Sequence, residues 1–222
     1  MATVYEPARP GATAANVLVL LPGFGDSPSA FQEARFVESV HKKAPTFDVV
    51  LADAHFGYYR KFDLVERLRA DVIVPLKARG YRELWLGGIS MGGFGALAFT
   101  MEHPDLVDGT LVLAPYLGPT DLIESIQEQG GLERWQPQSY AAEDDEERYY
   151  VRLWTWLKSL PGKREGPPVF LAWGENDRLR FANREMARVL PRSHVRTRAG
   201  DHDWETWHAL FEGFFVKLLA ER

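Results

Sequence analysis

The stretch that decides the fold of this 222-residue chain is Leu84-Trp85-Leu86-Gly87-Gly88-Ile89-Ser90-Met91-Gly92-Gly93-Phe94-Gly95. Its apolar first part predicts a buried strand, and the small residues after Gly92 predict a helix. Between them Ser90 stands in a G-x-S-x-G pattern, which is typical of a nucleophilic serine on a tight, strained turn. Glycine at positions 88 and 92 avoids side-chain collisions around that turn. The alternative interpretation of these residues is a structural glycine turn.

Short apolar runs recur along the chain, and longer stretches with helical periodicity separate them. The predicted strands are residues 16–21, 47–52, 83–87, 109–114, 169–173 and 193–198, and the predicted helices are residues 30–43, 62–79, 92–102, 182–190 and 204–220. This alternation predicts an α/β fold, with a mostly parallel twisted sheet of about six or seven strands flanked by helices. Pro75 should kink or interrupt the second helix. We expect a single domain over residues 1–222.

One connection, residues 116–166, is too long for a plain crossover between two strands. A helix is predicted within it at residues 145–160, and it contains the aromatic residues Trp135, Tyr149, Tyr150, Trp154 and Trp156. We interpret this connection as a small helical cap that shapes the substrate site. The alternative is an ordinary helical layer in which the aromatic side chains serve only for packing.

Composition excludes several classes of function. The net charge of −5 gives no basic surface for nucleic acid or anionic membranes. The chain has no cysteine, which excludes disulfides and thiolate chemistry. No metal-ligand motif occurs, so we expect neither a metal nor a cofactor. No apolar run approaches the roughly 20 residues of a membrane span, and the first residues lack the apolar core of a signal peptide. We therefore expect a cytoplasmic protein that acts on a small molecule, and the oligomeric state stays open.

A general base is expected after the last strand if the catalytic residues follow the order serine, acid, histidine. Of the six histidines only His202 has that position, four residues beyond the run that ends at Arg198. His194 and His208 fall within or near a strand and a helix, and they are more simply structural. His55 follows an earlier strand and could line a pocket. His202 is therefore the predicted base.

The acid is expected after the strand at residues 169–173, where Asp177 and Glu175 compete. We prefer Asp177, because a carboxylate there could hold the imidazole in the tautomer that accepts a proton from Ser90. The alternative role of Asp177 is to cap a helix. Asp201 and Asp203 flank His202 in sequence, so their side chains should diverge from it, and Asp203 suits the start of the final helix.

Two backbone N–H groups are candidates for an oxyanion hole. The helix after Ser90 directs its N-terminus at the reaction centre, which makes the N–H of Met91 the first donor. The glycine-rich loop at residues 20–27 follows the first predicted strand and offers the N–H of Phe24 as the second. The same loop could also be a turn in which Asp26 or Ser27 caps the next helix.

These motifs together resemble two groups of the α/β-hydrolase superfamily over nearly the whole chain. Residues 20–27 and 88–93 are similar to the phospholipase/carboxylesterase and acyl-protein thioesterase group, although Pro22 stands where that group has histidine. Residues 200–207 resemble the tail of the esterase D and enterochelin-esterase-like group, although Asp201 replaces a glycine. Either resemblance implies ester or thioester hydrolysis by a Ser90, Asp177 and His202 triad, with Phe24 and Met91 as oxyanion donors.

The expected reaction is therefore cleavage of a small-molecule acyl ester through an acyl-enzyme on Ser90. Aromatic residues near the predicted mouth suggest a partly apolar substrate pocket, and the candidates are Tyr58, Tyr59, Tyr116 and Trp204. Packing in the core is the alternative role of each. Two other functions stay open on the same fold: a lyase or acyltransferase, and a non-catalytic module that binds small ligands.

Overall fold

The computed structural model describes residues 1–161 and 166–222, and its strands form one seven-stranded sheet. The strand order is β1-β3-β2-β4-β5-β6-β7, with β1 antiparallel to β3 and all other neighbours parallel. The strands are β1 (Thr3–Glu6), β2 (Asn16–Leu21), β3 (Phe47–Ala52), β4 (Glu83–Ile89), β5 (Gly109–Leu113), β6 (Val169–Gly174) and β7 (Val195–Arg198). The prediction of a mostly parallel sheet of six or seven strands is confirmed.

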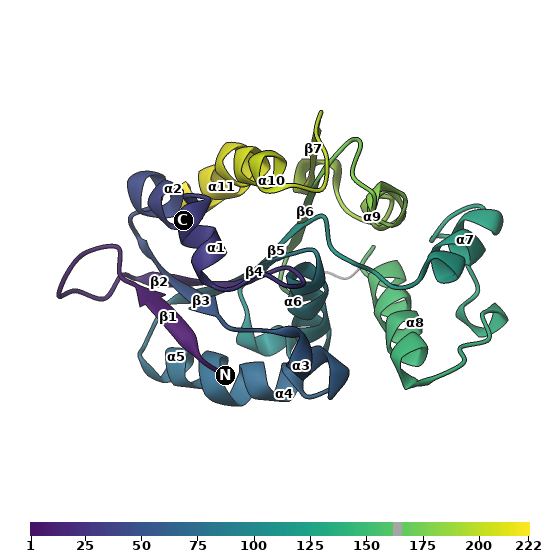
Figure 1. Cartoon of the computed structure of the whole chain (residues 1–222), viewed down its shortest axis with the longest axis horizontal. Coiled ribbons are helices and arrows are strands. Elements are labelled where there is room, and N and C mark those ends of the chain that lie inside the picture. The colour runs from purple at the N-terminus through teal and green to yellow at the C-terminus, as the bar shows by residue number, and fades with distance from the viewer. Residues whose placement is uncertain (162–165) are drawn as a thin grey trace.

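Helices cover both faces of this sheet (Figure 1). One face carries α1 (Ser29–Glu33), α2 (Phe36–Lys43), α10 (Trp204–Leu210) and α11 (Val216–Ala220). The other carries α3 (Phe56–Arg60), α4 (Leu64–Leu68), α5 (Val74–Ala78) and α6 (Met91–Glu102). In the part of the chain that the structure describes, no helix is both long and apolar enough to cross a bilayer.

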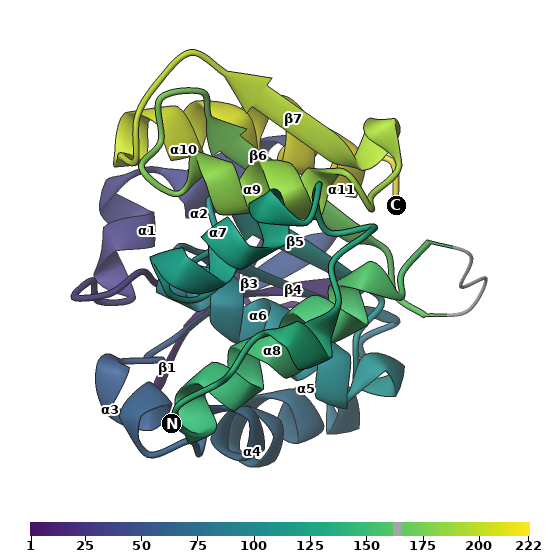
Figure 2. The ribbon, with the colours of Figure 1, turned by 90° about the vertical axis from the view of Figure 1, so that its right-hand side faces the viewer.

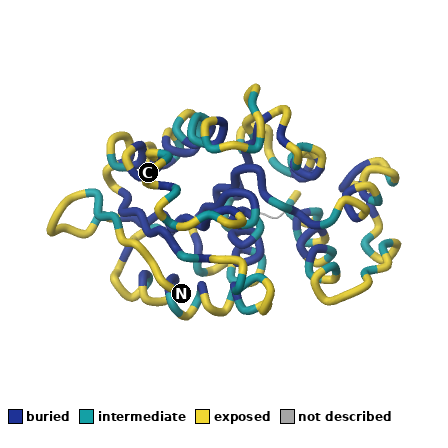
Figure 3. Tube along the Cα trace, in the orientation of Figure 1, coloured by how far each residue is buried: buried dark blue, intermediate teal, exposed yellow. Residues whose placement is uncertain are grey.

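The core follows the central strands, which are buried from end to end (Figure 3). A strand with helices on both faces has no solvent side, which explains why these runs are continuously apolar rather than alternating. At the carboxyl edge, β2 lies between β3 and β4, with Leu21 opposite Gly88. From β2 the chain continues to β3 on one side, and the next strand, β4, lies on the other side of β2. Such a reversal of strand order opens a crevice at the carboxyl ends of the strands.

Residues 116–161 fold beside this framework as two helices, α7 (Thr120–Glu128) and α8 (Asp145–Lys158), with a 3₁₀ turn at Pro137–Ser139 between them. Figure 2 shows α8 crossing in front of α6, with α7 next to α9 (Arg180–Ala187). The indole N–H of Trp154 donates to the carbonyl of Leu117 at 2.8 Å and fixes α8 to the start of the segment. Residues 162–165 of the predicted insertion lie outside the described residues.

Three predicted helices are interrupted. The helix expected at residues 204–220 becomes α10, a π-helical turn Phe211–Phe215, and α11. The helix expected at residues 30–43 breaks at Arg35, whose φ of 64° lies in the left-handed region. The helix expected at residues 62–79 becomes α4, a π-helical turn Arg69–Ile73, and α5. Pro75 occupies the first turn of α5, as expected of a residue without an N–H to donate, so the predicted interruption is confirmed.

A buried carboxylate, Asp48 on β3, ties the N-terminal segment to the sheet. It accepts hydrogen bonds from the hydroxyls of Tyr5 and Tyr81 and from the backbone N–H groups of Ala8 and Ala14. Burial opposes its ionisation, but these hydrogen bonds outweigh that effect and lower the pKa of Asp48 below its ordinary value. Asp48 is therefore a stabilising anion of the fold, remote from the strand ends that carry the candidate site.

Candidate active site

Ser90 lies at the strand-to-helix turn between β4 and α6, in a conformation that few non-glycine residues adopt. Its φ of 53° and ψ of −114° are strained for an L-residue. The turn is held by backbone hydrogen bonds from the N–H of Ser90 to the carbonyl of Leu113 (2.9 Å) and from the N–H of Tyr116 to the carbonyl of Ser90 (3.0 Å). The side chain is 6% exposed, at the carboxyl edge of the sheet.

The two glycines of the motif are required by close backbone contacts. A Cβ on Gly88 would lie 2.2 Å from the carbonyl oxygen of Gly92, and a Cβ on Gly92 would lie 2.2 Å from the carbonyl oxygen of Leu21. Both distances are far below van der Waals contact. The turn around Ser90 can therefore form only with glycine at these positions, which is the physical content of the G-x-S-x-G pattern.

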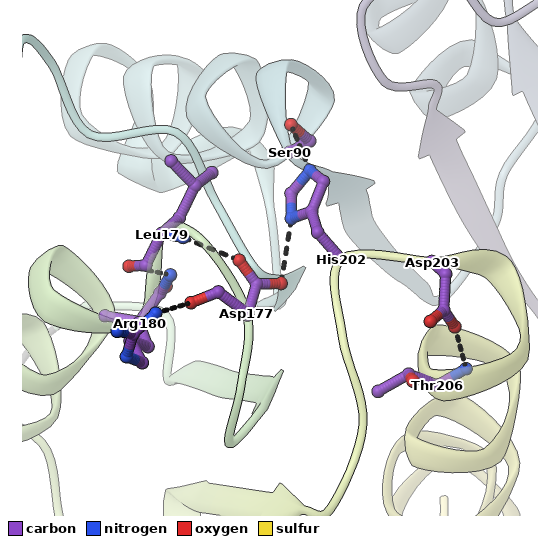
Figure 4. A network of polar contacts seen from close by, with 8 residues as sticks. Ser90, Asp177, Leu179, Arg180, His202, Asp203 and Thr206 are labelled. Carbon is purple, nitrogen blue, oxygen red and sulfur yellow. Dashed lines mark hydrogen bonds and ion pairs between the residues drawn. The ribbon is translucent and has the colours of Figure 1, made fainter.

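His202 lies in the loop between β7 and α10 and points at Ser90 (Figure 4). Its Nε2 is 3.1 Å from the Oγ of Ser90. The imidazole also packs at 89° and 4.8 Å between centroids against the indole of Trp207, on α10. This edge contact restricts rotation of the ring, so Nε2 stays directed at the serine oxygen.

Asp177 lies in the loop after β6 and completes a line of hydrogen bonds. Its Oδ2 is 2.8 Å from Nδ1 of His202, and its Oδ1 accepts from the N–H of Leu179 at 2.7 Å. An ionised carboxylate can only accept, so Nδ1 carries a proton and Nε2 is left with a lone pair toward Ser90. The Asp177 side chain is fully buried, which keeps water from competing for its oxygens.

The loops of the acid and the histidine are bonded to each other through their backbones. The N–H of Glu175 donates to the carbonyl of Arg198 at 2.8 Å, and the N–H of Asn176 donates to the carbonyl of Gly200 at 3.0 Å. Gly174 approaches Gly200 so closely that a Cβ on Gly174 would lie 2.4 Å from the Gly200 carbonyl oxygen. The relative position of Asp177 and His202 is thus set by main-chain contacts.

The competing acids have other partners. Glu175 accepts a hydrogen bond from the hydroxyl of Thr197 at 3.2 Å. Asp203 caps α10, because its Oδ1 accepts from the N–H of Thr206 at 2.7 Å, as its position before the final helix predicted. Asp201 is exposed. Of the acids weighed for the role, Asp177 is the one that contacts the His202 ring.

The two predicted oxyanion donors lie at neighbouring strand ends. Met91 is the first residue of α6, where the N–H groups have no partner within the helix. Phe24 lies in the loop after β2, and a Cβ on the preceding Gly23 would be 3.7 Å from the Cβ of Ser90.

The alternative in which Asp26 or Ser27 caps the next helix is wrong. Helix α1 has Pro28 at its N-cap and no side-chain cap.

Asp26 is instead a carboxylate at the mouth of the site. One of its oxygens would lie 2.9 Å from a Cβ on Gly23. Burial raises the pKa of Asp26, while the Trp204 side chain and the charge of His202 act in the opposite direction. Sequence reasoning considered Asp26 only as a helix cap, and no local pattern would have placed it near His202.

A pocket of about 180 Å³ lies between α3, α4, α6 and α8, and Met91, the residue after Ser90, belongs to its lining. It follows the side of α6 from Met91 past Phe94 to Glu102. It is lined mainly by aromatic side chains, namely Phe56, Tyr59, Phe62, Phe94, Tyr149 and Tyr150. Burial and neighbouring carboxylates raise the pKa of Tyr149 and Tyr150, which are therefore neutral hydroxyl groups.

The four aromatic residues proposed for substrate contact have different surroundings. Tyr59 lines the pocket. Tyr58 instead stacks on His55 at 4.5 Å, and Trp204 packs edge to face on Phe31 and Trp207. Tyr116 follows the serine turn and meets the ring of Tyr150 at 5.7 Å. Sequence reasoning missed Phe94, because its position in an apolar helix gives no signal for a pocket.

Within the described residues, no group of three or more histidine, aspartate or glutamate side chains is arranged to hold a metal ion. The chemistry available at this site is that of Ser90, His202, Asp177 and the nearby backbone N–H groups.

The sheet order and the serine turn together define an α/β-hydrolase fold. The apoenzyme structure of S-formylglutathione hydrolase from Staphylococcus aureus has a TM-score of 0.65 at 15% identity, over 93% of this chain and 82% of that chain. The monoacylglycerol lipase of Paleococcus ferrophilus has a TM-score of 0.64 at 16% identity, over 99% of this chain and 98% of that chain. The predicted fold class is confirmed.

The family model described as putative esterase matches residues 2–218, and the chain belongs to this family. An acetyl esterase from Caldicellulosiruptor saccharolyticus is 25% identical over 182 residues. That match covers 73% of this chain and 63% of the acetyl esterase, so the chain spans less than two thirds of the relative's length. The resemblance to esterases inferred from the motifs is confirmed.

Proposed function

We propose that this protein is a serine hydrolase that cleaves a small carboxylic ester or thioester through an acyl-enzyme on Ser90. The observation that carries the proposal is the hydrogen-bonded line from the Ser90 Oγ through both nitrogens of His202 to Asp177. Such an arrangement turns a weakly nucleophilic hydroxyl into an effective nucleophile at neutral pH. Membership of the esterase family supports the same reaction.

In the first half of the reaction, Ser90 Oγ attacks the acyl carbonyl carbon while Nε2 of His202 accepts the hydroxyl proton. The ring then carries a positive charge, which the buried carboxylate of Asp177 stabilises through Nδ1. When the tetrahedral intermediate collapses, Nε2 returns the proton to the leaving alcohol or thiol. The products of this half are the acyl-enzyme and the free leaving group.

In the second half, water takes the place of the leaving group. His202 removes a proton from that water, the hydroxide attacks the acyl carbonyl carbon, and the proton is returned to Ser90 Oγ as the acid departs. The oxyanion that forms in both halves would be met by the N–H groups of Met91 and Phe24. Donors of this kind stabilise the transition state by about 3–4 kcal/mol each in comparable enzymes.

We also propose that residues 116–166 form a cap within the single domain of residues 1–222. The placement of Glu146, Tyr149 and Tyr150 in the pocket wall supports this role, since all three belong to α8. The substrate would then be held between the cap and the serine turn.

Turnover of p-nitrophenyl acetate and labelling by a fluorophosphonate test the proposal. We expect release of p-nitrophenol and acetate in equal amounts and one covalent label, located on Ser90 by peptide mapping. Transfer of the acetyl group to an added alcohol in preference to water would indicate an acyltransferase. Absence of both turnover and label would leave a binding module and refute the proposal.

A further inference from the structure

The aromatic pocket beside Ser90 carries an inference about the substrate, and this inference rests on the proposed function. Four neighbouring rings in the pocket lining come from three separate elements. They are Tyr59 from α3, Phe94 from α6, and Tyr149 and Tyr150 from α8. The centroid of Phe94 lies 5.0 Å from that of Tyr150, 5.9 Å from that of Tyr149 and 6.1 Å from that of Tyr59. These are distances at which aromatic rings attract one another.

The entrance to the pocket is also aromatic and unusually exposed. Phe24, Phe56 and Phe62 are 64%, 41% and 58% exposed, and the Phe24 ring meets Phe56 edge to face at 4.8 Å. Phe24 belongs to the loop beside Ser90, whereas Phe56 and Phe62 line the pocket. Exposed apolar groups gathered at one place mark a binding surface. The contact between Phe24 and Phe56 therefore links the loop after β2 to the pocket lining.

The pocket wall extends along α6 farther than an acetyl group needs. Met91, Phe94, Ala98 and Glu102 form the α6 side of its wall. These residues recur at helical spacing, and the rise from the first to the last is about 16 Å at 1.5 Å per residue. An acetyl methyl group would reach only the Met91 end and would leave the aromatic walls without a partner.

The carboxylates in the pocket lining already have partners. Arg69 lies 3.6 Å from Glu66 and Arg152 lies 3.8 Å from Glu102. Glu102 and Glu146 also accept hydrogen bonds from the hydroxyls of Tyr149 and Tyr150. An uncharged substrate group would enter the pocket without disturbing these pairs.

We propose that this pocket binds an uncharged aromatic ring carried by the ester. Edge-to-face contact with Phe94, Tyr149 and Tyr150 would favour a ring over a saturated group of similar size. The aromatic ring can belong to either side of the ester bond, since Met91 of the pocket lining directly follows Ser90.

Matched ester pairs test the proposal on each side of the bond. For the acyl side, we compare p-nitrophenyl 3-phenylpropionate with p-nitrophenyl 3-cyclohexylpropionate. For the alcohol side, we compare benzyl acetate with cyclohexylmethyl acetate. We expect kcat/KM to be about 10-fold or more higher for the aromatic member of one pair.

Variants of the pocket connect the preference to these residues. Phe94→Leu and Tyr149→Leu each retain an apolar side chain but remove a ring, and each should move the aromatic-to-cyclohexyl ratio toward one. Phe181→Ala is the control, because Phe181 is a 45% exposed phenylalanine on α9 outside the pocket lining. Thermal unfolding of each variant establishes that it is folded.

The outcomes separate this inference from the proposed function. Ratios near one in both wild-type pairs, or ratios that neither Leu variant changes, would overturn the aromatic assignment while p-nitrophenyl acetate turnover upholds the esterase. Loss of turnover with every ester, p-nitrophenyl acetate included, would instead count against the proposed function.

Discussion

The Nε2 of His202 lies 3.1 Å from the Oγ of Ser90, although 112 positions of the chain separate the two residues. No element contains both. Ser90 is held by the turn between β4 and α6, and His202 by the loop that joins β7 to α10. Their contact therefore depends on the order in which the sheet places its strand ends, which is how a parallel sheet assembles a site from distant residues.

Replacing Ser90 with alanine should reduce turnover of p-nitrophenyl acetate by about 10⁴-fold or more, because the members of a nucleophile–base pair act as a unit. The thermal unfolding midpoint should stay close to that of the wild type. Ser29→Ala is a matched control, since Ser29 is an exposed serine whose hydroxyl contacts Ser27 and Glu33. Activity of Ser90→Ala within about tenfold of wild type would refute the nucleophile assignment.

Asp177→Asn should fold and yet lose about 10⁴-fold in kcat, because the amide no longer stabilises the protonated ring and can donate to Nδ1. An amide N–H toward Nδ1 would place the ring proton on Nε2, where Ser90 needs an acceptor. Initial rates at saturating substrate measure the effect. Glu175→Gln is the control and should stay near wild type. If the two variants behaved alike, Asp177 would not be the imidazole partner.

Gly92→Ala tests the close approach of α6 to the loop after β2. The added Cβ would lie 2.2 Å from the Leu21 carbonyl oxygen and 2.5 Å from that of Pro22, so the backbone must shift. A displacement of about 1 Å at a catalytic centre can cost about 10²-fold in rate, and we expect at least that loss in kcat/KM. Gly213→Ala is the control, since nothing lies within 4 Å of its added Cβ. Normal activity of Gly92→Ala would show that the turn tolerates a side chain.

Asp48→Asn should destabilise the fold at neutral pH, because the amide nitrogen cannot accept the hydrogen bonds that the carboxylate receives. A cost of about 1–3 kcal/mol is expected, which is roughly 2–12 °C in the unfolding midpoint. The pKa of Asp48 is lowered on folding, so its contribution is present above the ordinary value near 3.8 and is lost as pH falls through the folded pKa.

Thermal unfolding at pH 7 and at pH 3 therefore gives a specific signature for Asp48. The difference between wild type and Asp48→Asn should narrow at pH 3, because Asp48 of the unfolded chain then binds a proton that the folded protein takes up only at lower pH. Asp105→Asn is the control, because Asp105 is exposed. A difference that is equal at both pH values would assign the effect of Asp48→Asn to packing rather than to charge.

Six of the seven strands could be predicted from the sequence to within a few residues. Five of them are continuous apolar runs, as expected of strands buried on both faces, whereas β7 is mostly exposed. Strand β1 could not: its four residues are mostly exposed and are held at the sheet edge by pairing with β3. The break at Arg35 was equally hidden, since its positive φ occurs without glycine. Tertiary contacts decide both features, and local sequence does not record them.

The residues predicted at the strand ends could be named because each lies at a fixed offset from an apolar run. Ser90, Asp177 and His202 are brought together in the structure, and their catalytic roles remain proposals. A partly apolar pocket could be predicted, but most of its lining could not. Its walls come from α3, α4, α6 and α8, so Tyr59 lines it while the adjacent Tyr58 turns toward His55.

Backbone hydrogen bonds join the loops of Asp177 and His202, so the site consists of two parts that are anchored separately in the fold. Residues 174–203 form one preassembled part, which carries the proposed acid and the proposed base. The serine turn is the other part, anchored in β4 and α6. The hydrogen bond between His202 and Ser90 links the proposed base to the proposed nucleophile. Substitutions of residues that pack beneath α10 should therefore change the reaction rate by moving Asp177 and His202 together relative to Ser90, without altering any reacting group.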